Sequence, residues 1–185
     1  QYDALSHSGM LLANEATFGK KGIPSYNFDK AKVIVSVAAD FLGTWLNPVE
    51  FARQYSVGRK INPEDAQMSK HIQFEGMLSL TGANADDRFV IKPSEANKVL
   101  LYLLSKISKE VAAPTIKDER LKKGLDMAAA MLIEAEGNAL LVAGSNDVNA
   151  QILVNTINQR LGAYGKTISW NGALQTKAGI DSEMV

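Results

Sequence analysis

The stretch Lys32-Val-Ile-Val-Ser-Val-Ala-Ala39 decides the fold class, because it is an almost continuous run of apolar, mostly β-branched residues. A second run of this kind, Ala139-Leu-Leu-Val-Ala143, stands far downstream. Such composition is typical of strands that are buried on both faces, as in a parallel sheet covered by helices on either side. The two runs predict an α/β, doubly wound fold with a mainly parallel sheet and helices on both faces.

Helical patterns alternate with shorter strand patterns around these runs. We expect further strands at 71–77 and 88–91, a loop at 19–24, and helices at 3–16, 47–57, after 92–94, after 114 and after 147. Asn47-Pro48-Val49-Glu50 is a strong helix start, in which Asn47 can cap and Glu50 can complete a capping box. We expect an α/β domain over 1–165 and a weakly patterned C-terminal extension over 166–185.

Composition excludes several classes of protein. The chain has 185 residues, 20 basic and 20 acidic side chains, two histidines and no cysteine. Zero net charge gives no long-range attraction to nucleic acid, and the absence of cysteine excludes disulfides, thiolate nucleophiles and cysteine-ligated clusters. The apolar runs are shorter than the ~20 residues of a membrane helix, so we expect no direct membrane insertion. Because the sequence begins at Gln1 rather than Met, we expect an excised piece of a longer chain.

Ligands of open α/β sheets bind beyond the carboxyl ends of the strands, which directs attention to the loops 40–47, 76–87 and 144–147. Neither a Gly-x-Gly-x-x-Gly nor a P-loop motif is present. The loops 40–47 and 144–147 each precede a helix, so each is open to two interpretations. One is an anion site at a helix N-terminus, and the other is a turn with a helix cap.

The clusters of polar residues in the sequence do not match known patterns of metal-binding or catalytic sites. His71 and Glu75 share one face of a predicted strand with Gln73 between them, so they are too far apart to ligate one metal ion. The segment 84–87 carries Asn84, Asp86 and Asp87 but lacks the glycine and distal glutamate of a calcium loop, which favours a solvated turn. No histidine lies near these carboxylates in sequence. We therefore expect no catalytic dyad, triad or metal site.

The order of segments resembles the molybdopterin oxidoreductase superfamily, the group of dimethyl sulfoxide reductase and formate dehydrogenase. The resemblance rests on 32–37 with the helix start at 47–50, on 84–94, and on 139–144, and it covers roughly 23–165. It implies a Rossmann-like domain of the molybdopterin-oxidoreductase type.

Longer phrases, at 2–6, 38–45, 48–55 and 78–86, resemble the large iron–sulfur subunit of bacterial alternative complex III, a quinol:electron-acceptor oxidoreductase. The resemblance implies a domain without molybdenum cofactor, fused to a ferredoxin-like part that holds the iron–sulfur clusters. It also implies other subunits of a respiratory complex as partners, and the periplasmic face of the bacterial inner membrane as the location.

The sequence departs from the active molybdenum enzymes where their cofactor lies. Asp40 would repel a pyrophosphate, Ser94 replaces a turn glycine, and Glu75 stands at best for the strand-end aspartate. Crevice candidates for cofactor binding are Asp40, Gly43, Thr44, Asn47, Glu75, Ser94, Gly144 and Ser145.

These departures lead us to expect a non-catalytic domain that supports electron transfer carried elsewhere in the parent chain. Two alternatives remain: the cofactor-binding segment of an active molybdopterin oxidoreductase, with its cofactor across 40–47, 75–83 and 92–95, and a stand-alone nucleotide-binding module. A crevice filled by Phe41 and Trp45 would favour the hypothesis of a non-catalytic domain over both alternatives.

Overall fold

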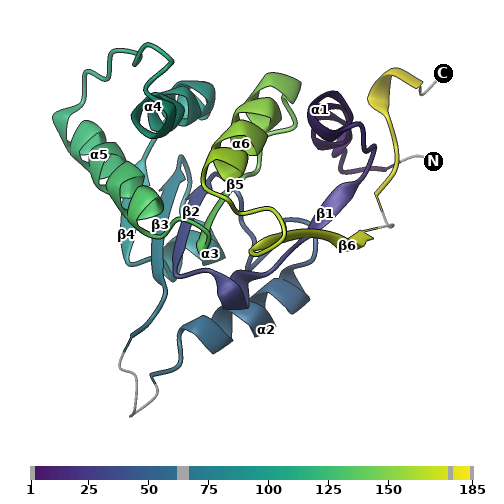
Figure 1. The fold of residues 1–185 in the computed structure, drawn as a ribbon, viewed down its shortest axis with the longest axis horizontal. Coiled ribbons are helices and arrows are strands. Elements are labelled where there is room, and N and C mark those ends of the chain that lie inside the picture. Colours follow the sequence, from purple (N-terminus) through teal and green to yellow (C-terminus); the bar gives the residue numbers. More distant parts are fainter. Residues whose placement is uncertain (1–2, 62–66, 175–176, 184–185) are drawn as a thin grey trace.

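The computed structural model describes residues 3–61, 67–174 and 177–183. Tyr2, which belongs to the stretch 2–6 that resembles the iron–sulfur subunit, lies outside them. Its centre is a four-stranded parallel sheet in the order β4-β3-β2-β5 (Figure 1). The strands are β2 (Val33–Val37), β3 (Lys70–Glu75), β4 (Asp87–Val90) and β5 (Ala139–Ala143). The chain builds outward from β2 in one direction and then crosses to the other side for β5. This reversal is the topological switch point of a doubly wound sheet.

Helices cover both faces of the sheet, which confirms the predicted fold class. One face carries α4 (Ala96–Ser108), α5 (Glu119–Glu134) and α6 (Val148–Arg160), and the opposite face carries α2 (Pro48–Gly58) (Figure 1). The first helix, α1 (Ser8–Phe18), packs along α6. A short helix, α3 (Leu80–Ala83), follows β3, and single 3-10 turns form at η1 (Phe28–Lys30), η2 (Pro93–Glu95) and η3 (Asp181–Glu183).

The continuous apolar strands arise from burial on both sides. In β2, Val33, Val35 and Val37 belong to the core beneath α4, α5 and α6, whereas Ile34 belongs to the core beneath α2. Strand β5 alternates in the same way, with Leu140 and Val142 in the α2 core. Because successive side chains of a strand point to opposite faces, each strand needs an apolar residue at nearly every position.

The outer edge of β5 is satisfied by side chains instead of by another strand. The Asn158 amide accepts from the Leu141 N–H at 3.0 Å and donates to the Leu141 carbonyl at 2.7 Å. Thr167 and Gln151 donate to the Ala139 and Ala143 carbonyls at 2.8 and 3.0 Å. These bonds close the edge to strand addition, the usual hazard of an exposed sheet edge.

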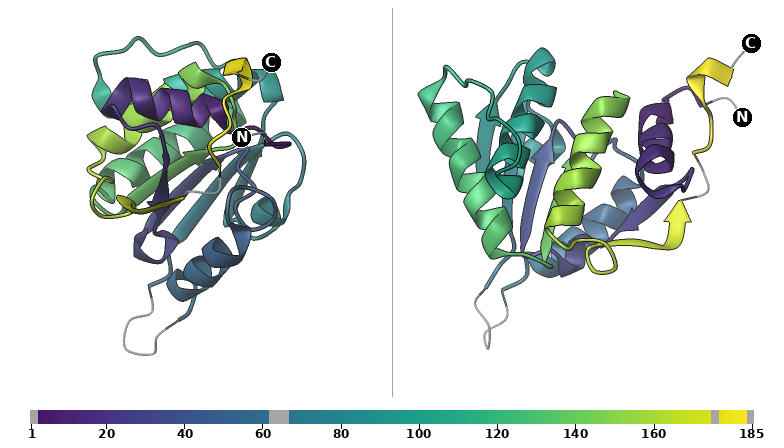
Figure 2. Two further views of the ribbon diagram at one scale, coloured as in Figure 1. Left: turned by 90° about the vertical axis from the view of Figure 1, so that its right-hand side faces the viewer. Right: turned by 45° about the horizontal axis from the view of Figure 1, so that its top comes forward.

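A second, two-stranded antiparallel sheet pairs β1 (Ile23–Tyr26) with β6 (Ile168–Leu174) (Figure 2). The expected loop at 19–24 is therefore wrong for Ile23 and Pro24. Four residues that include a proline carry little local strand signal, and β1 exists because β6 supplies its hydrogen bonds. Part of the segment 166–185 is thus bound to the rest of the fold.

Two other local expectations were also wrong. Residues 3–7 are not helical, since α1 begins at Ser8. The Asn47 side chain makes no capping bond, and the Glu50 carboxylate binds Arg53 and Gln54 instead of closing a capping box. A nearby cation and amide compete successfully for that carboxylate. None of the helices in the described ranges is long and apolar enough to cross a membrane.

Candidate functional site

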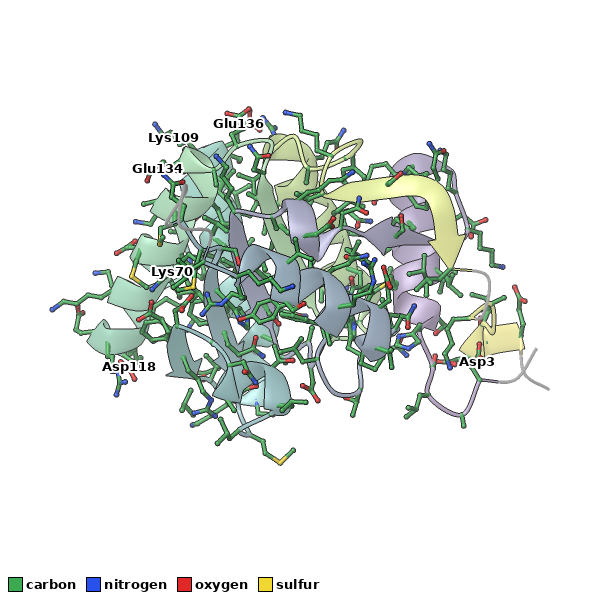
Figure 3. All side chains as sticks on the ribbon, turned by 90° about the horizontal axis from the view of Figure 1, so that it is seen from below. Asp3, Lys70, Lys109, Asp118, Glu134 and Glu136 are labelled. Carbon is green, nitrogen blue, oxygen red and sulfur yellow. The ribbon has the colours of Figure 1, made fainter. Side chains whose placement is uncertain are left out.

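A groove of about 1050 Å³ opens at the carboxyl ends of β2, β3 and β4, and we call it the carboxyl-edge groove. It brings together residues from the loops after those strands. These loops belong to the segments 40–47, 75–83 and 92–95, across which a cofactor would lie in the alternative of an active molybdopterin oxidoreductase. Figure 3 shows Asp118, which lines the groove, and Glu134 at opposite ends of α5, so the groove belongs to one end of the sheet. The lining residues are Ala38, Asp40, Thr44, Glu75, Gly76, Met77, Leu78, Ser79, Val90, Ile91, Lys92, Pro93, Glu95, Asp118 and Leu121.

The lining of the groove is acidic. Four carboxylates, those of Asp40, Glu75, Glu95 and Asp118, face one lysine, Lys92. Like charges at short range repel, and the repulsion is stronger near a protein surface than in bulk water. The groove is consequently a poor environment for a phosphate or pyrophosphate.

Glu75 is the last residue of β3 and has its hydrogen-bonding capacity filled. Its side chain is 4% exposed and accepts from Arg88 Nε at 2.6 Å, from the Ser79 hydroxyl at 2.6 Å and from Gln73 Nε2 at 3.0 Å. Burial would raise the pKa of Glu75, but the bonds from Arg88 and Ser79 outweigh it and lower that pKa. Glu75 occupies the strand-end position where an acid binds the ribose in dinucleotide-binding folds. Here it anchors the β3–α3 loop instead.

Asp40 organises the loop that follows β2. Its carbonyl accepts from the N–H groups of Gly43, Thr44 and Trp45 at 2.9 to 3.1 Å, and its Oδ1 accepts from the Thr81 N–H and hydroxyl at 3.0 and 2.8 Å. A Cβ atom at Gly43 would overlap Asp40 Oδ2, so a side chain there would displace the Asp40 carboxylate. Asp40 and Thr44 reach the groove, whereas Gly43 shapes the turn behind them.

The apolar side chains of this loop fold under it. Phe41 is fully buried, stacks on Phe28 with ring centroids 4.4 Å apart, and lies 5.2 Å from the His71 ring. Trp45 is 6% exposed and packs on Phe51 at 5.7 Å. Phe41 and Trp45 therefore fill the space beneath the loop 40–47.

The β5–α6 loop is a turn with a helix cap. Asp147 caps α6 by accepting from the Ala150 N–H at 2.7 Å. The Gly144 N–H donates to the Val37 carbonyl at 3.0 Å, and a Cβ atom there would overlap the Ala38 carbonyl. The loops after β2 and β5 thus touch at the switch point. Gly144 and Ser145 line no part of the groove.

The remaining candidates do not converge on the groove. Asn47 lies at the start of α2, and Ser94 is exposed within η2, between the lining residues Pro93 and Glu95. Sequence reasoning missed Val90 and Asp118, and it included Met77 and Leu78 only as part of the loop 76–87 without naming them as candidates. Asp118 was recognisable as a helix cap, but its place in the groove depends on how α5 packs.

A buried chain of hydrogen bonds crosses the α2 face of β3. Gln73 must donate to the Glu75 carboxylate, so its carbonyl oxygen faces His71 Nε2 at 3.4 Å. On the other side of the ring, His71 Nδ1 lies 3.2 Å from the Tyr55 hydroxyl, which donates its single proton to the Asn84 carbonyl at 3.0 Å. Burial lowers the pKa of His71 to about 4, so the imidazole is neutral at pH 7.

The acidic turn after α3 is held by ion pairs. Asp86 pairs with Arg59 at 2.7 Å, and Asp87 pairs with Lys70 at 2.7 Å. Each carboxylate has its own cation, and neither joins Glu75. Across the described ranges, no cluster of three or more histidine, aspartate or glutamate side chains could hold a metal ion.

No family model matches the sequence, and no curated protein matches it. Among solved structures, the chain is similar to one from the formyltransferase/hydrolase complex (FhcABCD) of Methylorubrum extorquens in complex with methylofuran. The TM-score is 0.54 at 12% identity, over 91% of this chain and 44% of that chain. The chain therefore spans less than half the length of that relative, and the likeness establishes a shared α/β fold.

Proposed function

We propose that the chain is a non-catalytic scaffold domain of the large iron–sulfur subunit of an alternative complex III-type quinol oxidoreductase. The observation that carries the proposal is the loop after β2. Dinucleotide-binding folds place a glycine-rich phosphate site there. In this chain the loop is wound around the Asp40 carbonyl, and Phe41 and Trp45 are buried beneath it.

The chemistry of the groove supports the same proposal. Molybdopterin nucleotides carry phosphates, and the groove offers four carboxylates, of which Glu75 is paired with Arg88, against one lysine. The ribose-binding position is held by Glu75, whose oxygens already accept bonds from Arg88, Ser79 and Gln73. The residues present do not fit such a cofactor.

Electron transfer would belong to other parts of the parent chain. The chain has no cysteine, so the iron–sulfur clusters of the proposed subunit must be ligated elsewhere. The domain would support the cluster-bearing part and dock other subunits at the periplasmic face of the inner membrane. The similar solved structure comes from a protein complex, which accords with a role in assembly.

The size of the groove favours the alternative of a cofactor-binding segment in an active molybdopterin oxidoreductase. Ligand sites commonly measure about 300–1,000 Å³, and the groove measures about 1050 Å³. The negative charge of the groove opposes that alternative, because the cofactor carries phosphates. It opposes the alternative of a stand-alone nucleotide-binding module for the same reason.

We expect no thermal shift when the chain is titrated with GMP, GDP, ATP or NAD at millimolar concentration. A nucleotide at ~100 times its dissociation constant would add about 2.7 kcal/mol, which raises the melting temperature of a domain of this size by roughly 5–10 °C. A nucleotide-binding protein in the same plate serves as the positive control. A shift of that size with any of the four would contradict the proposal.

A second measurement addresses the parent protein. The purified full-length subunit should release neither pterin nor molybdenum when it is denatured and extracted. Stoichiometric recovery of both would establish the active-enzyme alternative.

A further inference from the structure

Three large apolar side chains are exposed together in the carboxyl-edge groove. Met77 is 82% exposed, Leu78 63% and Val90 64%, and all three line the groove. Leu80, 56% exposed, follows at the start of α3. Single exposed apolar residues are ordinary, but a gathered apolar patch with a polar border marks a binding surface.

The patch is bordered by negative charge. The Glu75 charge is compensated by Arg88 at 2.6 Å, which leaves the carboxylates of Asp40, Glu95 and Asp118 against Lys92. Complementary charge governs which partner approaches such a surface and how fast. The groove therefore selects a partner that is both apolar and positively charged.

The two edges of the parallel sheet differ in whether their backbone groups have partners, and this difference also points to the carboxyl-edge groove. Side chains of α6 and the segment after it satisfy the β5 edge. Strand β4, by contrast, pairs only with β3 within the described residues, and Val90 at its end lines the groove. The unpaired edge of the sheet thus lies beside the apolar patch.

We propose that the carboxyl-edge groove docks a protein segment in which arginine or lysine side chains alternate with apolar side chains. The inference rests on the proposed scaffold role and names the chemistry of its partner. A second copy of the chain is the poorer occupant, because a two-fold contact would set this groove against itself and bring its carboxylates together.

Fluorescence anisotropy tests the proposal with a labelled twelve-residue peptide of alternating Leu and Arg. Two matched peptides replace every Arg by Glu or every Leu by Ser. We expect the Leu-Arg peptide to bind the chain at least tenfold more tightly than either one. Equal binding of the Leu-Glu peptide, or no binding of the Leu-Arg peptide, would overturn the proposal.

Variants place the binding on the groove. The double variant Met77→Ser/Leu78→Ser should weaken binding of the Leu-Arg peptide at least tenfold. The control Val49→Ser/Val57→Ser alters two residues of α2 that are 82% and 52% exposed and should leave binding unchanged. Equal loss in both variants would show nonspecific adsorption and overturn the proposal.

A charge variant gives an independent reading. Glu95→Gln/Asp118→Asn retains groups that accept the bonds these side chains make to the Lys92, Arg120 and Leu121 N–H groups. It should weaken peptide binding about fivefold at low salt and reduce the salt dependence, because fewer charges attract the peptide. An unchanged salt dependence would contradict the role assigned to the acidic border.

The outcomes separate the two proposals. A nucleotide shift or bound pterin would overturn the scaffold role, whatever the peptides do. Absence of peptide binding without a nucleotide shift would overturn only the docking proposal. Sedimentation that shows a dimer of the chain, lost in Met77→Ser/Leu78→Ser, would identify a second copy as the occupant and overturn the docking proposal.

Discussion

Replacement of Phe41 by alanine is expected to lower the free energy of unfolding by about 3–5 kcal/mol. The ring is fully buried and stacks on Phe28, with the Tyr55 ring 5.7 Å away in an edge-on arrangement. Its loss removes apolar burial and leaves a cavity beneath the loop 40–47. The loop cannot easily collapse into that cavity, because Asp40 ties its start to Thr81.

Urea denaturation of the wild type and Phe41→Ala, monitored by tryptophan fluorescence, measures the change. The control is Val49→Ala, which truncates a side chain that is 82% exposed and should alter stability by less than about 0.5 kcal/mol. A loss below 1 kcal/mol in Phe41→Ala would mean that Phe41 does not fill the space beneath the loop. It would thereby remove the main support for the scaffold proposal.

Stability should fall by about 2 kcal/mol when the pH is lowered from 7 to 5, because of His71. Burial depresses the pKa of His71 from 6.5 to about 4 in the folded chain. Between those values the unfolded chain binds a proton that the folded chain excludes, so acid favours unfolding. The contribution of His71 is complete above the unfolded pKa and is lost progressively as the pH falls through this window toward 4.

Urea titrations at pH 7, 6 and 5 provide the test, with His71→Gln as the variant that removes the titrating group. His71→Gln is expected to be less stable at pH 7, where it disturbs the bonds to Tyr55 and Gln73, but to show a flatter pH dependence. The comparison variant is His7→Gln, since His7 is half-buried and is the only other histidine. Burial lowers the pKa of His7 as well, so His7→Gln should also flatten the pH dependence, but less than His71→Gln does. A wild-type slope that persists in His71→Gln would contradict the assignment.

The sequence predicted correctly those elements whose hydrophobic pattern depends only on the local geometry of one strand or helix. The runs 32–39 and 139–143 predicted strands buried on both faces, and the structure pairs them side by side, with β2 inside the sheet and β5 at its edge. The same reasoning placed His71 and Glu75 on one strand face with Gln73 between them. Hydrophobic periodicity reports local geometry, and local geometry was sufficient for these elements.

The candidate site was only partly predictable. The rule that ligands bind beyond the carboxyl ends of strands pointed to the loops 40–47 and 76–87, and the family resemblance pointed to 92–95; the structure brings residues of all three segments to one groove. The same rule also included Gly144 and Ser145, which belong to a capped turn outside the groove. The exposure of Met77 and Val90 had no signal in sequence, because apolar residues beside a strand are more often buried.

By itself the sequence determined the α/β class, the buried strands of the sheet and the absence of cysteine chemistry, since these follow from residue type and local period. Only the tertiary structure decided the pairing of β1 with β6, the burial of Phe41 and Trp45, and the acidic, apolar character of the groove. Each of these depends on residues far apart in the chain. Their contacts are set by how helices and loops pack on the sheet, and no local pattern encodes that packing.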